Sequence, residues 1–120
     1  MADQIILTPQ PIRLAATGKQ ALAAAVEVSD YPKLVLQIVV PALEGTSSPT
    51  ATIRIITSNQ KETEDGWTVV GTFSTVNAAA FSDVIEITKH VKYIRWEVSG
   101  LTGTAPAVTF MIAGYGRDAF

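Results

Sequence analysis

The sequence predicts an all-β protein, an antiparallel β-sandwich of about eight strands in one domain that covers residues 1–120. Short segments rich in Val, Ile and Thr recur along the chain, most of them alternate apolar with polar residues, and clusters of Gly, Ser and Pro separate them. The chain has 120 residues, 48% of them hydrophobic, and no cysteine. At this length roughly two-thirds of the unfolded surface can be buried, so a core needs neither a disulfide nor a metal.

The chain begins with a segment that belongs at the edge of a sheet. Residues 4–14 carry Pro9 and Pro11, and proline lacks the N–H group that a central strand must donate. Residues 1–16 are therefore predicted as an N-terminal arm or edge segment.

Residues 19–28 allow two interpretations. Thr17-Gly18-Lys19-Gln20 has the form of a capping box, and the alanine-rich stretch behind it favours a helix. A strand would instead place four residues on one face: Leu22, Ala24, Val26 and Val28. The all-β context leaves a lone helix few partners, so the strand is favoured.

The next two strands differ in their pattern. Residues 34–40 are an apolar, β-branched run closed by Pro41, which is typical of a strand buried on both faces. Residues 50–57 alternate, so Ile53 and Ile55 are predicted on the buried face.

The second half of the chain supplies four more strands, predicted at residues 67–73, 83–88, 93–98 and 107–112. Alternation places one set of side chains in the core: Trp67, Val69, Phe73, Ile94, Trp96, Val98, Val108, Phe110 and Ile112. It places a second set on the surface: Tyr93, Arg95 and Glu97. Both tryptophans are thus predicted to be core residues.

Turn clusters at residues 45–49, 58–66 and 100–106 separate the strands. The segment Leu43-Glu44-Gly45-Thr46-Ser47-Ser48-Pro49 is similar to Leu101-Thr102-Gly103-Thr104-Ala105-Pro106, and a strand follows each. Two interpretations stay open: similar hairpins that build two similar halves, or Gly-Thr-Pro turns that recur by chance.

Charge and composition exclude several classes of function. Nine basic residues stand against eleven acidic ones, for a net charge of −2, whereas a nucleic-acid binder needs a surplus of Lys and Arg. The N-terminus lacks the positive charge and long apolar core of a signal peptide, and no stretch reaches the ~20 apolar residues of a membrane span. We find no nucleophile motif. The prediction is a protein that is not an enzyme and uses no cofactor.

Two polar features could still carry chemistry. His90 is the only histidine; it could act as a general base or ligand, but no partner motif accompanies it, so a solvated loop histidine is favoured. Glu62, Glu64 and Asp65 share one loop and could hold Ca²⁺. Their spacing is not that of an EF-hand, so a solvated turn at Asp65-Gly66 is favoured, and no metal ligand is assigned.

Both chain ends carry apolar groups without an evident place in the core, namely the proline-rich arm and a C-terminal tail at residues 114–120. Such groups either cover the ends of the sandwich or dock on another protein. The candidate protein contacts are Pro9, Pro11, Ile12, Tyr93, Tyr115, Arg117 and Phe120.

Two stretches resemble known families. Residues 57–73 combine Ser58-Asn59, Asp65-Gly66 and Trp67 in a hairpin, and Lys92-Tyr93-Ile94-Arg95-Trp96-Glu97-Val98 forms the strand after it. The pattern is similar to small jelly-roll-like β-sandwich structural proteins of tailed bacteriophages and, more weakly, to discoidin-like (galactose-binding-like) domains. The short chain, the lack of cysteine and the Thr/Ala-rich composition fit the phage type better.

The phage resemblance implies a capsid-decoration or head-surface protein, or a small tail component, that acts by protein–protein binding. Its partners would be further copies of itself, for example in a trimer, and a major capsid or tail protein, with neither nucleic acid nor membrane involved. It would be assembled in the host cytoplasm and located in the virion. The discoidin resemblance implies the alternative, a carbohydrate-binding module that uses the loop at residues 58–67, with or without Ca²⁺.

Overall fold

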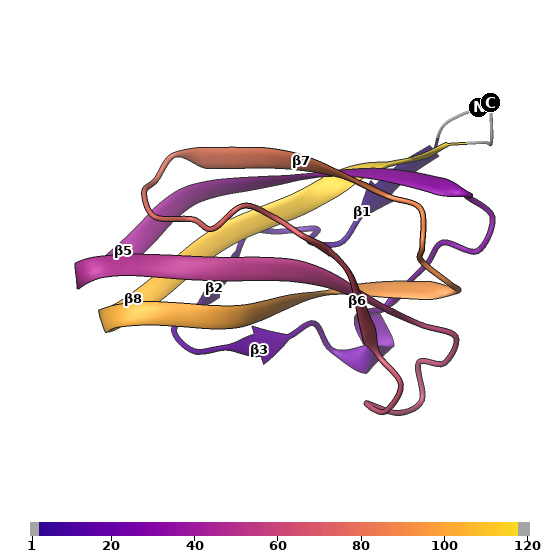
Figure 1. Cartoon of the computed structure of the whole chain (residues 1–120), viewed down its shortest axis with the longest axis horizontal. Helices are drawn as coiled ribbons and strands as arrows, with labels where there is room; N and C mark the ends of the chain where they lie inside the picture. The colour runs from indigo at the N-terminus through magenta and orange to yellow at the C-terminus, as the bar shows by residue number, and fades with distance from the viewer. Residues whose placement is uncertain (1–2, 118–120) are drawn as a thin grey trace.

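The computed structural model describes residues 3–117, which form one eight-stranded antiparallel sheet, so the predicted all-β antiparallel class is confirmed. Two long strands dominate it. β5 (Lys33–Ser58) and β8 (Tyr93–Arg117) pair with each other from end to end, with Lys33 opposite Arg117 and Ser58 opposite Tyr93. The sequence predicts four separate strands here. The structure joins them into one long two-stranded ribbon, which folds over in its middle (Figure 1).

The ribbon bends at the two similar turn sequences. Thr46 pairs with Thr104, so the two segments lie opposite each other. Gly45 and Gly103 have φ values of 124° and 111°, which L side chains rarely adopt. A Cβ at Gly45 would lie 3.1 Å from the Cα of Pro106, and one at Gly103 would lie 2.9 Å from the Cα of Pro49. The similarity of the segments therefore has a structural reason: two paired strands bend at the same point.

Folding the ribbon produces two layers (Figure 1). In the first, β7 (Phe81–Ile87) pairs with the first half of β5, while β1 (Asp3–Ile6) and β2 (Ile12–Leu14) pair with the second half of β8. This edge position agrees with the prediction for the proline-containing segment.

The second layer uses the other halves of the ribbon. β6 (Thr68–Thr72) pairs with the second half of β5, and β3 (Gly18–Lys19) and β4 (Val26–Glu27) pair with the first half of β8. A 3₁₀-helix, η1 (Leu22–Ala24), separates β3 from β4. The favoured strand at residues 19–28 is thus interrupted, and the alternative α-helix does not form. Across residues 3–117, no helix is long and apolar enough to cross a membrane.

The core lies between the two layers. Leu34, Leu36 and Ile38 of the first layer and Ile53 and Ile55 of the second are fully buried in one hydrophobic cluster. The rings of Trp96 and Phe110, from opposite halves of β8, meet edge to face with centroids 5.0 Å apart. Trp96 is therefore a core residue, as predicted.

Several sequence predictions are wrong. The run at residues 34–40 is buried on one face only, because Val35, Gln37 and Val39 point away from the core. Residues 114–117, predicted as a tail, are the end of β8, where Gly116 pairs with both Leu34 and Asp3.

A β-bulge changes the parity of β6. Ile55 lies opposite Gly71 but Ile56 lies opposite Val69, so β6 contains one extra residue, Val70. Phe73 is buried as predicted, whereas Val69 is exposed and Trp67 is only half-buried, outside the core cluster.

Candidate functional site

The first layer presents an unusually apolar outer face to solvent. Along β5, Val35, Gln37 and Val39 alternate with the buried core residues and point outward. The same parity continues across the paired strands, where it also includes the polar residues Ser82 and Glu86 of β7. We call the remaining, mostly apolar set the outer face: Gln4, Ile6, Val35, Gln37, Val39, Val84, Met111, Ala113 and Tyr115. The solvent-facing side of an antiparallel sheet is ordinarily polar, so this composition requires an explanation.

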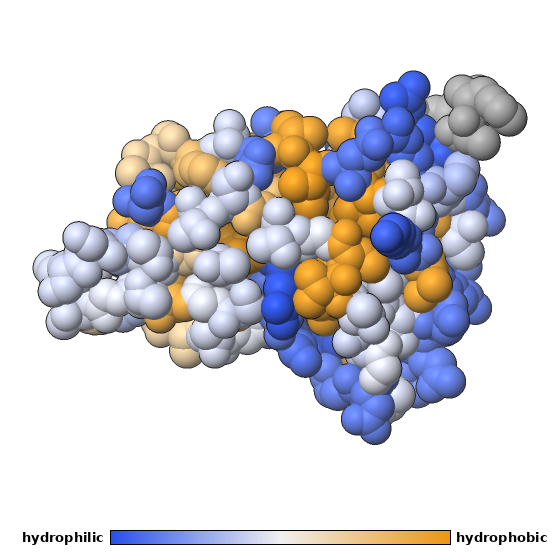
Figure 2. Space-filling model, viewed as in Figure 1, coloured by the Kyte–Doolittle hydropathy of each residue, from blue (hydrophilic) through white to orange (hydrophobic). Residues whose placement is uncertain are grey.

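Three residues of the outer face are especially open to water. Val84 is 56% exposed, Ile6 47% and Tyr115 40%. Val84 sits on the edge strand β7. Figure 2 views a different side, on which the edge strands of both layers, β7 and β6, run; hydrophobic groups gather in its middle too, and neutral groups lie over the bend of the ribbon. Exposed apolar groups that are contiguous commonly mark a contact with another molecule.

The outer face is hollowed at its centre. A depression of about 440 Å³ is lined by Gln4, Val35, Gln37, Val84, Ala113, Gly114 and Tyr115. Two of the lining residues, Ala113 and Gly114 of β8, are small, and the polar side chains are those of Gln4, Gln37 and Tyr115. Because an amide both donates and accepts hydrogen bonds, a partner that covers the hollow must supply polar groups to match Gln4 and Gln37.

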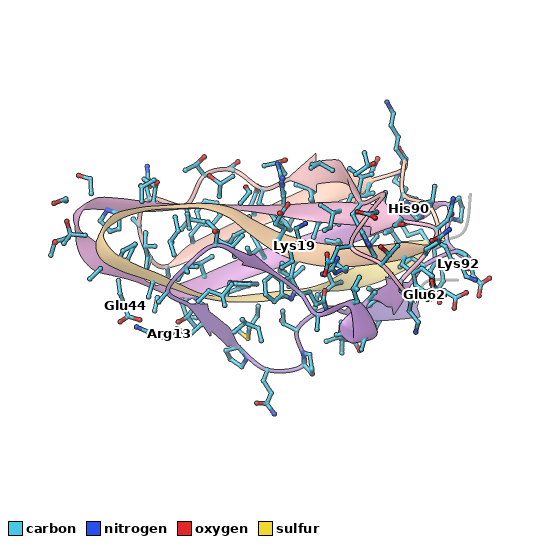
Figure 3. The ribbon with its side chains drawn as sticks, turned by 90° about the horizontal axis from the view of Figure 1, so that it is seen from below. Arg13, Lys19, Glu44, Glu62, His90 and Lys92 are labelled. Atoms are coloured by element: carbon cyan, nitrogen blue, oxygen red, sulfur yellow. The ribbon has the colours of Figure 1, made fainter. Side chains whose placement is uncertain are left out.

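An ion pair lies at each end of the outer face. The Lys33 ammonium lies 2.9 Å from the Glu86 carboxylate at one end. Near the bend, Arg13 donates two hydrogen bonds to Glu44, at 2.9 and 3.2 Å, and these hold the pKa of the Glu44 carboxyl below its usual value. Figure 3 shows Arg13 beside Glu44 at that end.

The edge strand that carries Val84 is fixed by a side chain. The Asp83 carboxylate accepts hydrogen bonds from the backbone N–H groups of Ser74, at 2.8 Å, and Val84, at 2.9 Å. These bonds hold the pKa of Asp83 below its usual value, and the bond from Ser74 contributes most. They tie the incoming loop to the start of β7.

The structure scatters the predicted contact residues. Tyr115 lies on the outer face, and Arg117 ends β8 at the same register as Lys33. Pro9 and Pro11 are exposed between β1 and β2. The remaining described candidates are half-buried: Ile12 pairs with Phe110, and Tyr93 begins β8 in the second layer. Phe120 lies outside the described residues.

Sequence reasoning missed Ile6, Val39 and Val84 as candidate contacts. The missed signal was parity, since Val35 and Val39 share a face with Gln37, which a strand buried on both sides would not contain. Near Val84, the charged residues Asp83 and Glu86 fall on opposite faces of the strand. Alternation therefore does not show which face is buried.

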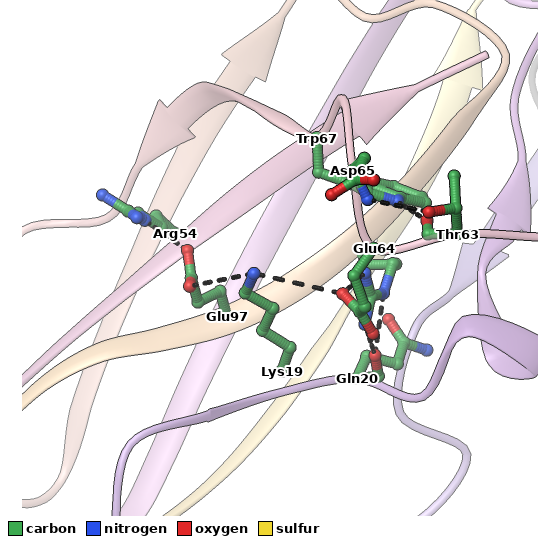
Figure 4. A network of polar contacts seen from close by, with 9 residues as sticks. Lys19, Gln20, Arg54, Thr63, Glu64, Asp65, Trp67 and Glu97 are labelled. Carbon is green, nitrogen blue, oxygen red and sulfur yellow. Dashed lines mark hydrogen bonds and ion pairs between the residues drawn. The ribbon is translucent and has the colours of Figure 1, made fainter. Parts of the chain in front are cut away.

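The loop at residues 58–67 covers a buried arginine. Arg95, predicted on the surface, is 1% exposed. Its Nη1 donates to Glu64 at 2.9 Å, its Nε donates to the Gln20 carbonyl at 2.7 Å, and its Nη2 donates to both groups (Figure 4). The Trp67 ring centroid lies 4.7 Å from the guanidinium carbon, so Trp67 and Glu64 close over the charge.

Gln20 completes this network from the other side. Its side-chain N–H donates to the carbonyl oxygens of Leu7 and Ala24, each at 3.0 Å, and its side-chain oxygen accepts the N–H of Trp96 at 3.1 Å. A fixed glutamine therefore holds the carbonyl that receives Arg95.

The calcium and carbohydrate alternatives placed their site in this loop. Two of its residues, Glu64 and Trp67, contact Arg95. Within residues 3–117 there is no cluster of three or more His, Cys, Asp or Glu that could hold a metal ion. The predicted turn at Asp65-Gly66 is present, and Gly66 has a φ of 82°.

His90 is half-buried rather than solvated. Its Nε2 lies 2.5 Å from the carbonyl oxygen of Tyr31, so Nε2 carries the proton and donates. His90 lines a depression of about 570 Å³ with polar neighbours that include Ser29, Asn59 and Lys92. Figure 3 shows His90, Lys92 and Glu62 together at the end opposite the bend. The hydrogen bond ties the loop before β5 to the loop before β8.

The Arg95 network makes folding depend on pH. Hydrogen bonds from Arg95 hold the pKa of Glu64 below its usual value, so the ionised form favours the folded state. This stability is present above the unfolded-state pKa and is lost as pH falls through the lowered, folded-state pKa, beginning below about pH 5. Glu64→Gln is expected to lower the Tm at pH 7 and to flatten the decline of Tm between pH 7 and pH 3.

Thermal melts of the wild type, Glu64→Gln and Glu62→Gln check this expectation. Glu62 shares the loop but has no contact with Arg95 among the described interactions, so its variant should follow the wild-type curve. If the Tm falls with pH in the same way for Glu64→Gln and the wild type, the Arg95–Glu64 pair does not stabilise the fold.

No family model matches the chain, and no curated protein is significantly similar to it.

Proposed function

We propose that the chain is a non-enzymatic structural protein of a phage particle that acts by binding other proteins. Within the particle it is a capsid-decoration or other head-surface protein, or a small tail component. One observation carries the proposal: the apolar outer face of the first layer, with Val84, Ile6 and Tyr115 open to water. The similarity of residues 57–73 and 92–98 to phage β-sandwich proteins supplies the setting.

The outer face suits a protein partner better than a small molecule. It spans β1, β8, β5 and β7, so it is broad, while none of the residues that line its hollow is charged. Interfaces of this kind gain affinity from apolar area and are enriched in Tyr and Met, both of which occur here. Many copies on a symmetric particle would add weak contacts into firm attachment.

The ion pairs support a structural role. Four carboxylates are matched with cations and join separate strands or loops. These pairs are Arg13–Glu44, Lys33–Glu86, Arg54–Glu97 and Arg95–Glu64.

Val84→Lys is expected to remove attachment without unfolding the protein. Val84 is exposed, so a lysine there should change the free energy of unfolding by no more than about 0.5 kcal/mol. It would, however, place an unpaired charge in the contact. The test is quantitative mass spectrometry of gradient-purified phage particles produced with either form of the chain. The wild type should be present in many copies and the variant strongly depleted.

Val91→Lys is the matched control, because Val91 is 41% exposed in the loop before β8, outside the outer face. It should attach as the wild type does. If the wild-type chain is missing from purified particles, the virion assignment is wrong; if Val84→Lys attaches normally, the outer face is not the contact.

A further inference from the structure

We propose that Asp83 protects the free edge of β7 against pairing with a strand from another molecule. Among residues 3–117, β7 pairs with β5 along one side and with no strand along the other. Such an edge presents unpaired backbone N–H and C=O groups, to which a further strand can add. The inference concerns the backbone of this edge strand, so it is independent of the virion assignment.

The other edges of the two layers, as far as the structure describes them, carry interrupted strands. In the first layer, Pro9 and Pro11 lie between β1 and β2. In the second layer, η1 separates β3 from β4, and the bulge at Val70 interrupts β6. Prolines, bulges and short strands commonly protect a sheet edge. β7 has none of them, since Phe81–Ile87 pair with β5 without a shift in register.

The Asp83 side chain points toward the interior from this regular edge. Exposure alternates along β7, and Asp83 shares its face with Phe81, Ile85 and Ile87, whereas Val84 points outward. An added strand would cover this carboxylate and remove the water that solvates its charge, which costs free energy. An inward-pointing charge on an edge strand therefore opposes strand addition.

The carboxylate also occupies a backbone donor of the free edge. One oxygen of Asp83 accepts the N–H of Val84 at 2.9 Å. A side chain can reach this N–H only from the open side of β7, because β5 fills the other side. Alternate residues of a strand direct their N–H groups to the same side, so Ser82 and Glu86 are the other edge-facing donors. A strand that added here would have to displace Asp83 from the central donor.

The second oxygen of Asp83 fixes the segment that crosses between the layers. It accepts the N–H of Ser74 at 2.8 Å. Ser74 lies between Phe73 and Val76, whose backbones hydrogen-bond to the half of β5 in the second layer. One carboxylate thus links the margins of both layers, and its removal would release two backbone donors at once.

Asp83→Ala is expected to make the purified chain associate through β7. In sedimentation equilibrium, its weight-average mass should exceed that of the wild type at the same concentration by about two-fold or more, because the edge is free to pair. Glu86→Ala is the matched control: it removes one negative charge from the same strand, where Glu86 pairs with Lys33, and leaves both backbone contacts of Asp83 in place. It should sediment as the wild type does. Equal association of both variants would mean that charge alone protects the edge, and the proposal would be wrong.

Adding Val84→Pro to Asp83→Ala separates edge pairing from aggregation of an unfolded chain. Proline has no N–H, and an edge strand tolerates it where the N–H faces away from the sheet. The excess mass of Asp83→Ala should therefore disappear in the double variant. An excess that persists would show that the association does not use this edge.

Amide hydrogen exchange of the wild type tests the contact without any substitution. The Val84 amide should exchange several-fold more slowly than the amides of Ser82 and Glu86, which face the same edge without a carboxylate acceptor among the described hydrogen bonds. Equal exchange rates at the three positions would overturn the proposal, as would an Asp83→Ala variant that sediments as the wild type does.

Discussion

Replacing Gly114 with alanine is expected to prevent the chain from folding stably. Gly114 lies on β8, opposite Leu36 of β5 on one side and Ile5 of β1 on the other. A methyl group there would overlap the carbonyl oxygen of Val35 and lie 2.8 Å from the Cα of Leu36. Both obstacles are backbone atoms, so relief requires separating β5 from β8. The cost should exceed about 3 kcal/mol, the upper end of ordinary overpacking.

Gly100→Ala is the matched control on the same strand. Its added methyl group would meet the side chain of Thr52 at 3.5 Å, an ordinary contact distance. Far-ultraviolet circular dichroism and thermal melts should show a folded Gly100→Ala variant, and a Gly114→Ala variant that is unfolded or insoluble. A Gly114→Ala variant that melts within a few degrees of the wild type would mean that β5 and β8 do not approach as closely as the structure shows.

The sequence was sufficient to predict the class of fold and most of the strands. Alternation identified the inward residues of the strands around Ile53, Trp96 and Phe110, since each of these strands buries one face against a core. It could not show that β5 and β8 are continuous. That property depends on Thr46 lying opposite Thr104, a pairing between segments far apart in the chain.

Errors of parity had local physical causes. The extra residue in β6, Val70, turned Val69 outward and left Trp67 at the margin of the core. A bulge of this kind is set by the partner strand, so a pattern within one strand does not reveal it. Arg95 follows the outward parity of its strand, yet it is buried, because Glu64 and Trp67 from a distant loop cover it.

The candidate contact surface was predicted only at one residue. Tyr115 was selected as part of a tail without a place in the core, and it lies on the outer face as part of β8. Its neighbours Val35 and Val84 come from other strands, and only the register of β8, β5 and β7 brings the three together. A surface assembled across strands has no signature along the sequence.

Arg95→Ala is expected to destabilise the protein by about 3 kcal/mol. Truncation leaves the buried carbonyl of Gln20 without its donors, at a cost of about 1–3 kcal/mol. It also removes the aliphatic stem that packs in the interior, and the cation beneath the Trp67 ring. The loop at residues 58–67 loses its attachment to the second layer. For a domain of this size, a loss of this magnitude should lower the Tm by roughly 10 °C.

Arg95→Lys separates charge from geometry. Lysine keeps the positive charge but lacks the planar fork that serves Gln20 and Glu64 at once, so it should recover only part of the lost stability. Arg54→Ala is the control, because Arg54 also pairs with a glutamate, Glu97 at 2.6 Å, yet its side chain is 35% exposed. That pair should contribute no more than about 1 kcal/mol. If Arg95→Ala and Arg54→Ala lower the Tm equally, the contacts of buried Arg95 with Gln20, Glu64 and Trp67 add no more stability than an exposed ion pair does.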